Sequence, residues 1–192
     1  TDPQPMRTSK RSRDRGVTMV EFALLFGLLL ALAIGAFEYG MVFRDSLTVT
    51  TAAREGGRVA ASTANYQDAD CVILEAAAGA LQSLNSGTVD EIHIYKSDET
   101  GFVPGANALT MRRYSPYQNN DPSLVACTGS DWNAEWLGLD WEPVDRVNTL
   151  GGADWIGVRI KYEHTWLTNF LWWNGTVPLA DEAVFRIEPP AP

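Results

Sequence analysis

The sequence is short of the residues from which metal and catalytic sites are built. It holds two cysteines, Cys71 and Cys127, and two histidines, His93 and His164, all far apart along the chain. Structural zinc sites use close pairs of Cys or His ligands, and no such pair occurs here. The sequence also lacks a glycine-rich phosphate loop and a G-x-S-x-G nucleophile motif. We therefore expect no metal, no cofactor and no enzyme activity.

Basic residues are scarce beyond the N-terminus. Residues 1–16 carry five Lys or Arg and two Asp, whereas the remainder carries ten Lys or Arg and 22 Asp or Glu, a net charge of −12. Such an acidic surface cannot neutralise a row of phosphates, which argues against a nucleic-acid partner. A basic arm before an apolar run is typical of the cytoplasmic side of a membrane helix. We expect residues 1–16 to be a cytoplasmic leader, with residues 1–15 disordered.

One long apolar run follows the basic arm. Val17 to Phe37 is interrupted only by Thr18 and Glu21. As a helix, these residues would span about 31 Å, close to the hydrocarbon thickness of a bilayer. The run is longer than the apolar part of a cleaved secretory signal, and no small-x-small cleavage site ends it. We predict a transmembrane helix over residues 17–40, with Glu38 at the outer boundary, where water can solvate it.

The helical pattern continues past the predicted membrane segment. Small or apolar residues recur at spacings of three and four: Val42, Ser46, Val49, Ala53, Gly56 and Ala60. That spacing predicts a helix with a narrow face that another element can approach closely. We therefore expect one helix from about Val17 to about Ala61, whose second half, residues 41–61, belongs to an extracytoplasmic domain over residues 41–192.

The remainder of that domain, residues 62–192, alternates between helix and strand patterns. Apolar positions predict a helix from Asp70 to Leu84, with Asp68 or Asp70 as its cap: Val72, Leu74, Ala77, Ala78, Leu81 and Leu84. Alternation predicts strands at Glu91–Lys96, Phe102–Val103, Trp155–Trp166 and Ala183–Ile187. Residues 104–152 are rich in Gly, Pro, Asn and Asp and are expected to be irregular. The predicted fold class is α+β, a long N-terminal helix packed on a small antiparallel β-sheet.

Two further features concern the surface and the cysteines. Outside the cytoplasm, a disulfide between Cys71 and Cys127 is chemically permitted, and buried free thiols are the alternative. All seven tryptophans lie after residue 130. The segment that ends in Trp172 and Trp173, with Phe170, leads into an Asn-Gly turn, so it is either core or an exposed aromatic contact tip.

A short motif lies at the junction of the arm and the apolar run. A basic stretch ends in Gly16, the apolar run begins at Val17, and Glu21 lies five residues after Gly16. This arrangement resembles the type IV prepilin pattern. The resemblance implies that a prepilin peptidase cuts between Gly16 and Val17. A carboxylate inside hydrocarbon costs several kcal/mol, roughly, unless it finds a partner. In an assembled bundle, Glu21 could pair with the new α-amine of a neighbour and fix the register; otherwise it is a solvated residue at the headgroup level.

A second stretch narrows this resemblance. Thr51 to Ala61, with Arg54, Glu55, Gly56 and Arg58, is similar to the segment that follows the membrane helix in TadE-like minor pilins of tight-adherence pili. Gly57 stands where we would expect Ala. The resemblance implies a bacterial cytoplasmic-membrane protein that packs with other pilin subunits and meets an inner-membrane assembly platform. The alternatives are a solvated ion-paired helix face for the motif, and an uncleaved tether for a binding or hydrolytic domain.

Overall fold

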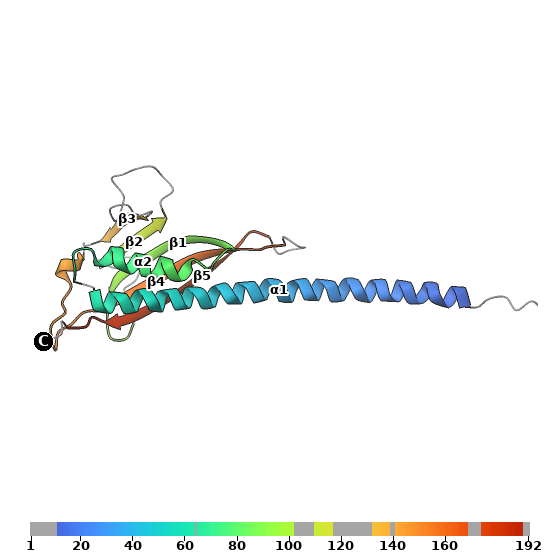
Figure 1. Cartoon of the computed structure of the whole chain (residues 1–192), viewed down its shortest axis with the longest axis horizontal. Helices are drawn as coiled ribbons and strands as arrows, with labels where there is room; N and C mark the ends of the chain where they lie inside the picture. Colours follow the sequence, from blue (N-terminus) through green and yellow to red (C-terminus); the bar gives the residue numbers. More distant parts are fainter. Residues whose placement is uncertain are drawn as a thin grey trace, which may run out of the picture. The chain divides into compact units, whose positions relative to one another are not determined.

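The computed structural model describes residues 11–63, 65–101, 110–116, 132–138, 141–168 and 174–189. The chain divides into two compact units, Thr1–Gly40 and Met41–Pro192. Helix α1, Arg11–Thr63, belongs to both units, and every other described element lies in the second (Figure 1).

Helix α1 confirms the long helix that the sequence predicts. It ends two residues beyond the expected end and begins earlier, at Arg11. The expectation that residues 11–15 are disordered is therefore wrong for their backbone. Arg and Lys are good helix formers, and an apolar helix directly after them removes the cost of nucleating a separate one.

Helix α2, Ala69–Leu81, confirms the second predicted helix, although it ends three residues early. Asp68 is its N-cap residue, but the Asp68 side chain makes no capping hydrogen bond. Leu74, Ala77 and Leu81 are buried as expected, whereas Val72 is 43% exposed and Ile73 is fully buried in its place. The buried face of α2 is thus the predicted one, except that Ile73 takes the place of Val72.

The domain contains a five-stranded antiparallel sheet in the order β3-β2-β1-β4-β5. The strands are β1 Gly87–Ser97, β2 Thr110–Pro116, β3 Trp132–Gly138, β4 Trp155–Thr165 and β5 Thr176–Arg186. Strands β1, β4 and β5 confirm three predicted strands; β1 and β5 are longer than expected, and β4 ends one residue early. The expectation that residues 104–152 are irregular is wrong, since β2, β3 and the 3-10 turn η2, Pro143–Asp145, lie there. Residues 102 and 103 lie outside the described residues.

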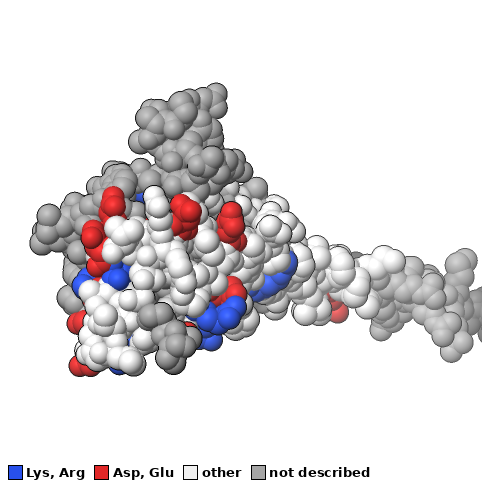
Figure 2. All heavy atoms as spheres, turned by 60° about the vertical axis from the view of Figure 1, so that its left-hand side comes forward, with Lys and Arg blue, Asp and Glu red and all other residues white. Residues whose placement is uncertain are grey.

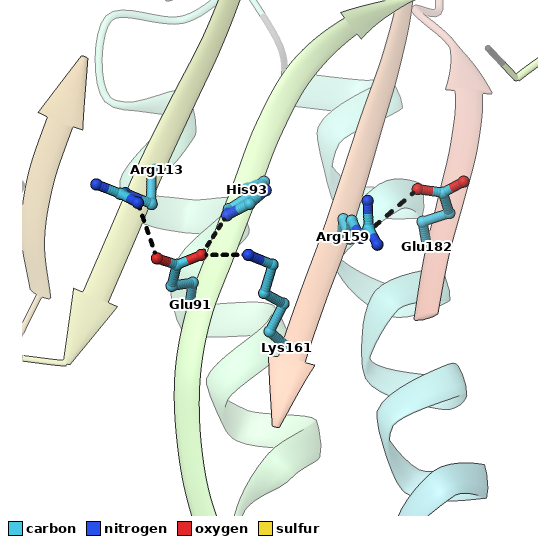
Figure 3. A network of polar contacts seen from close by, with 6 residues as sticks. All are labelled: Glu91, His93, Arg113, Arg159, Lys161 and Glu182. Carbon is cyan, nitrogen blue, oxygen red and sulfur yellow. Dashed lines mark hydrogen bonds and ion pairs between the residues drawn. The ribbon is translucent and has the colours of Figure 1, made fainter. Parts of the chain in front are cut away.

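Side chains from both helices meet one face of the sheet and form the core. Ile92, Ile94, Val158 and Ile160 are fully buried there, with Val49, Ala53 and Ala60 from α1 and Ile73 from α2. Burial of each large aliphatic side chain contributes roughly 1.5–3 kcal/mol. The predicted alternation in β4 is confirmed, because Ile156, Val158 and Ile160 share this face. Arg159 and Lys161 lie on the opposite face (Figure 3).

Candidate assembly helix and its domain

The first part of α1 is a helix that leaves its apolar side chains exposed. Most large apolar residues from Val17 to Phe37 are about half to three-quarters exposed, and Met19 reaches 75%, whereas Ile34 is half-buried. The helix is long and apolar enough to cross a membrane, with a mean hydropathy of 2.4 over its most apolar window, none of which is buried. Exposing this much apolar surface to water would cost several kcal/mol of transfer free energy, so the surface is expected to be covered by lipid or by other helices.

Within this unit the three residues of the predicted processing site lie on a continuous helix. Gly16, Val17 and Glu21 are all exposed, and α1 passes through them without a break. No described atom lies within 4 Å of a Cβ built on Gly16. Packing therefore gives no reason for glycine at position 16, where it weakens helix preference by about 1 kcal/mol relative to alanine.

Glu38 corrects the expectation that water solvates the outer end of the apolar run. Its side chain is fully buried, like Gly35 before it and Asp45 after it. The spacings of three and seven residues place all three on one helix face, and that face is buried. The apolar run does end just before Glu38 in the sequence, but Glu38 lies on the buried face of the helix.

The part of α1 in the second unit packs through the narrow face that the sequence predicts. Val49, Ala53, Gly56 and Ala60 are buried, and Val42 and Ser46 are half-buried. A Cβ on Gly56 would lie 3.2 Å from Val158 of β4 and 3.4 Å from Ala77 of α2. Gly56 is therefore the point where α1 meets both the sheet and α2.

The structure explains the glycine at position 57, which the sequence alone does not. A Cβ at this position would lie 2.6 Å from a ring carbon of Phe185 on β5 and 3.4 Å from Ala183. The alanine expected from the resemblance would force the Phe185 ring to move. Glycine at position 57 thus matches an aromatic residue on the last strand, 128 positions later.

A buried polar pair fixes α1 on the sheet. The Nδ1 atom of His164 on β4 lies 2.8 Å from Oδ2 of Asp45, and both side chains are fully buried. The Tyr162 hydroxyl lies nearby, and burial, followed by the Asp45 carboxylate, raises the pKa of Tyr162 to about 12. Asp45 Oδ1 and His164 Nε2 have no hydrogen-bond partner among the described residues. Such a pair sets position more than it adds stability, because both groups lose their hydration.

The charged residues of the second motif point to solvent. Arg58 Nη2 lies 2.6 Å from Glu55 Oε1 three residues before it, and Arg54 is exposed. The Arg58 guanidinium donates to the carboxylate and lowers the pKa of Glu55. Exposed pairs of this spacing contribute a few tenths of a kcal/mol, roughly. Hence Gly56 serves packing, while Arg54, Glu55 and Arg58 do not hold the domain together.

The sheet face away from the helices carries a polar network centred on Glu91 of β1 (Figure 3). Glu91 accepts from Lys161 Nζ at 2.7 Å and from Arg113 Nη1 at 3.0 Å, and lies 2.8 Å from His93 Nε2. Burial alone would raise the pKa of Glu91, but the hydrogen bonds from Lys161 and His93 prevail and hold it at about 2. Sequence reasoning placed Arg159 and Lys161 on one strand face but missed Glu91 as the partner of Lys161, since β1 and β4 are distant in sequence. Arg159 lies 4.0 Å from Glu182 of β5 instead.

His93 in this network has a lowered pKa. Burial lowers its pKa, and the hydrogen bond with Glu91 only partly opposes that shift. His93 Nδ1 has no hydrogen-bond partner among the described residues, which fits a neutral ring that donates through Nε2. Within the part of the chain that the structure describes, no three His, Cys, Asp or Glu residues gather as metal ligands.

The structure describes only some of the remaining predicted site residues. Cys71 lies on α2, half-buried, whereas Cys127 lies outside the described residues, so their disulfide stays a prediction. Peptide mapping without reductant would check it, and two alkylatable thiols in the exported protein would contradict it. Phe170, Trp172 and Trp173 also lie outside the described residues. Trp155, the first residue of β4, and Trp166, directly after its end, are half-buried.

Taken together, these features define a class of protein in which an apolar helix suited to a bilayer continues into an α+β domain and packs there on an antiparallel sheet. Comparison with known families narrows this class further. Residues 16–58 match the family model described as TadE-like protein, which confirms the resemblance seen in the same residues. The match begins at Gly16 and ends at Arg58, so it covers the apolar run and the motif in the domain half of α1. No curated protein and no solved structure matches the chain.

Proposed function

We propose that this chain is a minor pilin-like subunit of a Tad pilus, a structural and assembly protein that α1 anchors in the bacterial cytoplasmic membrane. The observation that carries the proposal is the TadE-like match over residues 16–58 on a helix whose first half is mostly exposed and apolar. A Tad pilus-associated protein needs such a helix first in lipid and then against other subunits.

The proposed topology follows from charge. The basic arm stays in the cytoplasm, and the acidic domain, residues 41–192, lies outside. A prepilin peptidase removes the leader between Gly16 and Val17. The new α-amine of Val17 then lies one helical turn from Glu21, and Glu21 of one subunit pairs with the amine of the next. The partners are therefore the peptidase, the bilayer, other pilin subunits and the inner-membrane assembly platform.

Substitution of Gly16 tests the proposal. Gly16 and Gly27 are both exposed glycines of α1 with no described atom within 4 Å of a built Cβ. Gly16→Leu and Gly27→Leu should therefore insert equally well, because both make the helix more apolar. Gly16→Leu should keep its leader in cells with an active prepilin peptidase, whereas Gly27→Leu should lose it. A leader retained by the wild type would instead favour an uncleaved tether for a binding or hydrolytic domain.

A further inference from the structure

The segment after η2 presents three aliphatic side chains to solvent. Val144 is 60% exposed, Val147 41% and Leu150 90%. Single exposed aliphatic residues are ordinary, but three within seven residues form a patch. We refer to Val144, Val147 and Leu150 as the distal patch. It lies at the end of the domain that carries the last turn of α1, the end turned toward the viewer in Figure 2.

The backbone holds the distal patch in place. Val147 and Asp154 exchange two hydrogen bonds, Val147 N to Asp154 Oδ2 at 3.0 Å and Asp154 N to Val147 O at 2.8 Å. Between them, Gly152 N donates to Thr149 O and closes a tight turn with Leu150 at its tip. Below the turn, Arg146 is buried against Asp70 of α2 at 2.5 Å. Leu150 is thus presented by an ordered loop, which lowers the entropic cost of binding.

A second apolar patch lies on the domain half of α1. Phe43 is 66% exposed and Leu47 53%, one turn apart on the same face. We refer to these two residues as the helix patch. Leu47 lies ten residues beyond Phe37, about 15 Å along the helix axis. The headgroup layer is only about 5–8 Å thick on each side of the hydrocarbon, so lipid cannot cover Leu47.

Charged residues beside the two patches are complementary. Asp145 is exposed between Val144 and Val147, and Arg54 is exposed two turns after Leu47. Neither side chain pairs with any residue that the structure describes. Arg54 is therefore an exposed cation on a domain whose net charge is strongly negative, and Asp145 is an exposed acid within the distal patch.

We infer that the distal patch of one copy binds the helix patch of a second copy, with Asp145 beside Arg54. This inference rests on the proposed function. Within one copy the patches are offset along α1: Glu188 N donates to Ala61 O and Ile187 N to Asp154 O, which fixes the distal loop beside Ala61. Ala61 lies 14 residues after Leu47, about 21 Å along the axis.

This offset decides where the contact can form. Two copies at equal depth in one membrane place their distal patches about 21 Å above each other's helix patches, so they cannot touch. Copies displaced by that distance along the axis can. Because the two surfaces differ, the contact is heterologous and repeats without closing, which builds an open strand. Neighbouring helices raise the effective concentration of the two patches, so a small contact suffices.

Cysteine crosslinking in cells that express the full chain tests this inference. Two tagged copies, one with Leu47→Cys and one with Leu150→Cys, should form a crosslinked heterodimer under mild oxidation. The equal-depth pairs, Leu47→Cys with itself and Leu150→Cys with itself, should not. Single variants serve as controls for Cys71 and Cys127. A 47–47 product without a 47–150 product would show that another helix covers the helix patch and would overturn the inference.

Charge reversal separates the contact from a folding defect. Arg54→Asp and Asp145→Arg should each lower the 47–150 product roughly two- to fivefold, and the two together should restore it. Loss without rescue would overturn the pairing. Leu150→Asp should lower self-association about tenfold or more, whereas Val72→Asp on α2 should not. Leader removal is scored in the same cells: a cleaved protein without the 47–150 product contradicts this inference alone, whereas an uncleaved one contradicts the proposed function as well.

Discussion

The two halves of α1 are one helix built for two surroundings. Residues 17–37 expose most of their large apolar side chains, whereas residues 41–61 bury a narrow face of small residues and expose mainly polar ones, with Phe43 and Leu47 as apolar exceptions. The two halves of this one helix therefore pack in different ways. In the first half, burial must come from outside the chain, while in the second half the sheet and α2 supply it.

The acids on α1 show the difference most sharply. Glu21 is exposed in the first half, and Asp45 is fully buried against His164 in the second. An acid whose partner is in its own chain should affect folding. An acid whose partner is in another chain should affect assembly and leave folding unchanged.

The largest expected effect tests this contrast. Asp45→Ala should lower the free energy of unfolding by about 3 kcal/mol, because it leaves His164 buried without its partner. Asp45→Asn, which retains a hydrogen bond, should cost less. Glu21→Ala should leave that free energy unchanged and still be cleaved, yet lose assembly. Urea unfolding in detergent and a count of surface pili measure the two effects. A Glu21→Ala protein that assembles normally would contradict the proposed register.

The next effect compares two glycines. Gly57→Leu should lower the free energy of unfolding by about 2 kcal/mol, because the Phe185 ring already occupies the space that a side chain would need. Gly27→Leu, in the first half of α1, should not lower it, because no described atom lies near a Cβ there. The same urea titration measures both. Equal stability of the two variants would mean that β5 does not approach α1 as closely as described.

A third effect of similar size concerns pH and belongs only to the domain. The pKa of Glu91 is about 2 in the folded domain and about 4.5 in the unfolded chain, so its contribution is present above pH 4.5 and lost as pH falls toward 2. The lowered pKa of His93 acts in the same direction below about pH 6.5. Between pH 7 and 3 the change at Glu91 should cost about 2 kcal/mol, and the change at His93 should add to that cost. Glu91→Gln should flatten the fall, whereas Glu163→Gln, on the exposed part of the same face, should not.

The smallest effect concerns the motif in the second half of α1. Arg58→Ala removes an exposed ion pair with Glu55 and should change the free energy of unfolding by less than about 0.5 kcal/mol. A loss of pilus assembly in that variant, with stability unchanged, would place Arg58 in a contact between subunits. A loss of several kcal/mol would instead show that the motif stabilises the domain itself.

Most of the helices and the central strands could be predicted from the sequence, because their patterns are local. Spacings of three and four residues reveal α1, and alternation reveals β4. Strands β2 and β3 could not be predicted, since they lie among Gly, Pro and Asn residues and depend on pairing with β1. Their side chains show too little alternation over seven residues to mark a strand.

The residues of the candidate site also divide into those with a local sequence signal and those that only the fold brings together. Gly16, Glu21 and the motif after the apolar run could be predicted as site residues because each has a signal within a few residues, and their roles stay predictions. The pair of Asp45 and His164 was missed, since 119 positions separate them and only the fold brings them together. Gly57 was noticed as a departure, but its reason, Phe185, lies on the last strand. Glu38 was misplaced because a sequence boundary does not show toward which side a helix turns a residue.

The central claim is that α1 begins, in the working protein, at Val17. The most direct measurement is peptide mapping of the N-terminus of the protein recovered from native membranes in a host with an active prepilin peptidase. The proposed function predicts an N-terminal peptide that starts at Val17 and no peptide that joins Arg15 and Gly16 to Val17. A continuous peptide across Gly16 and Val17 as the main product would contradict it.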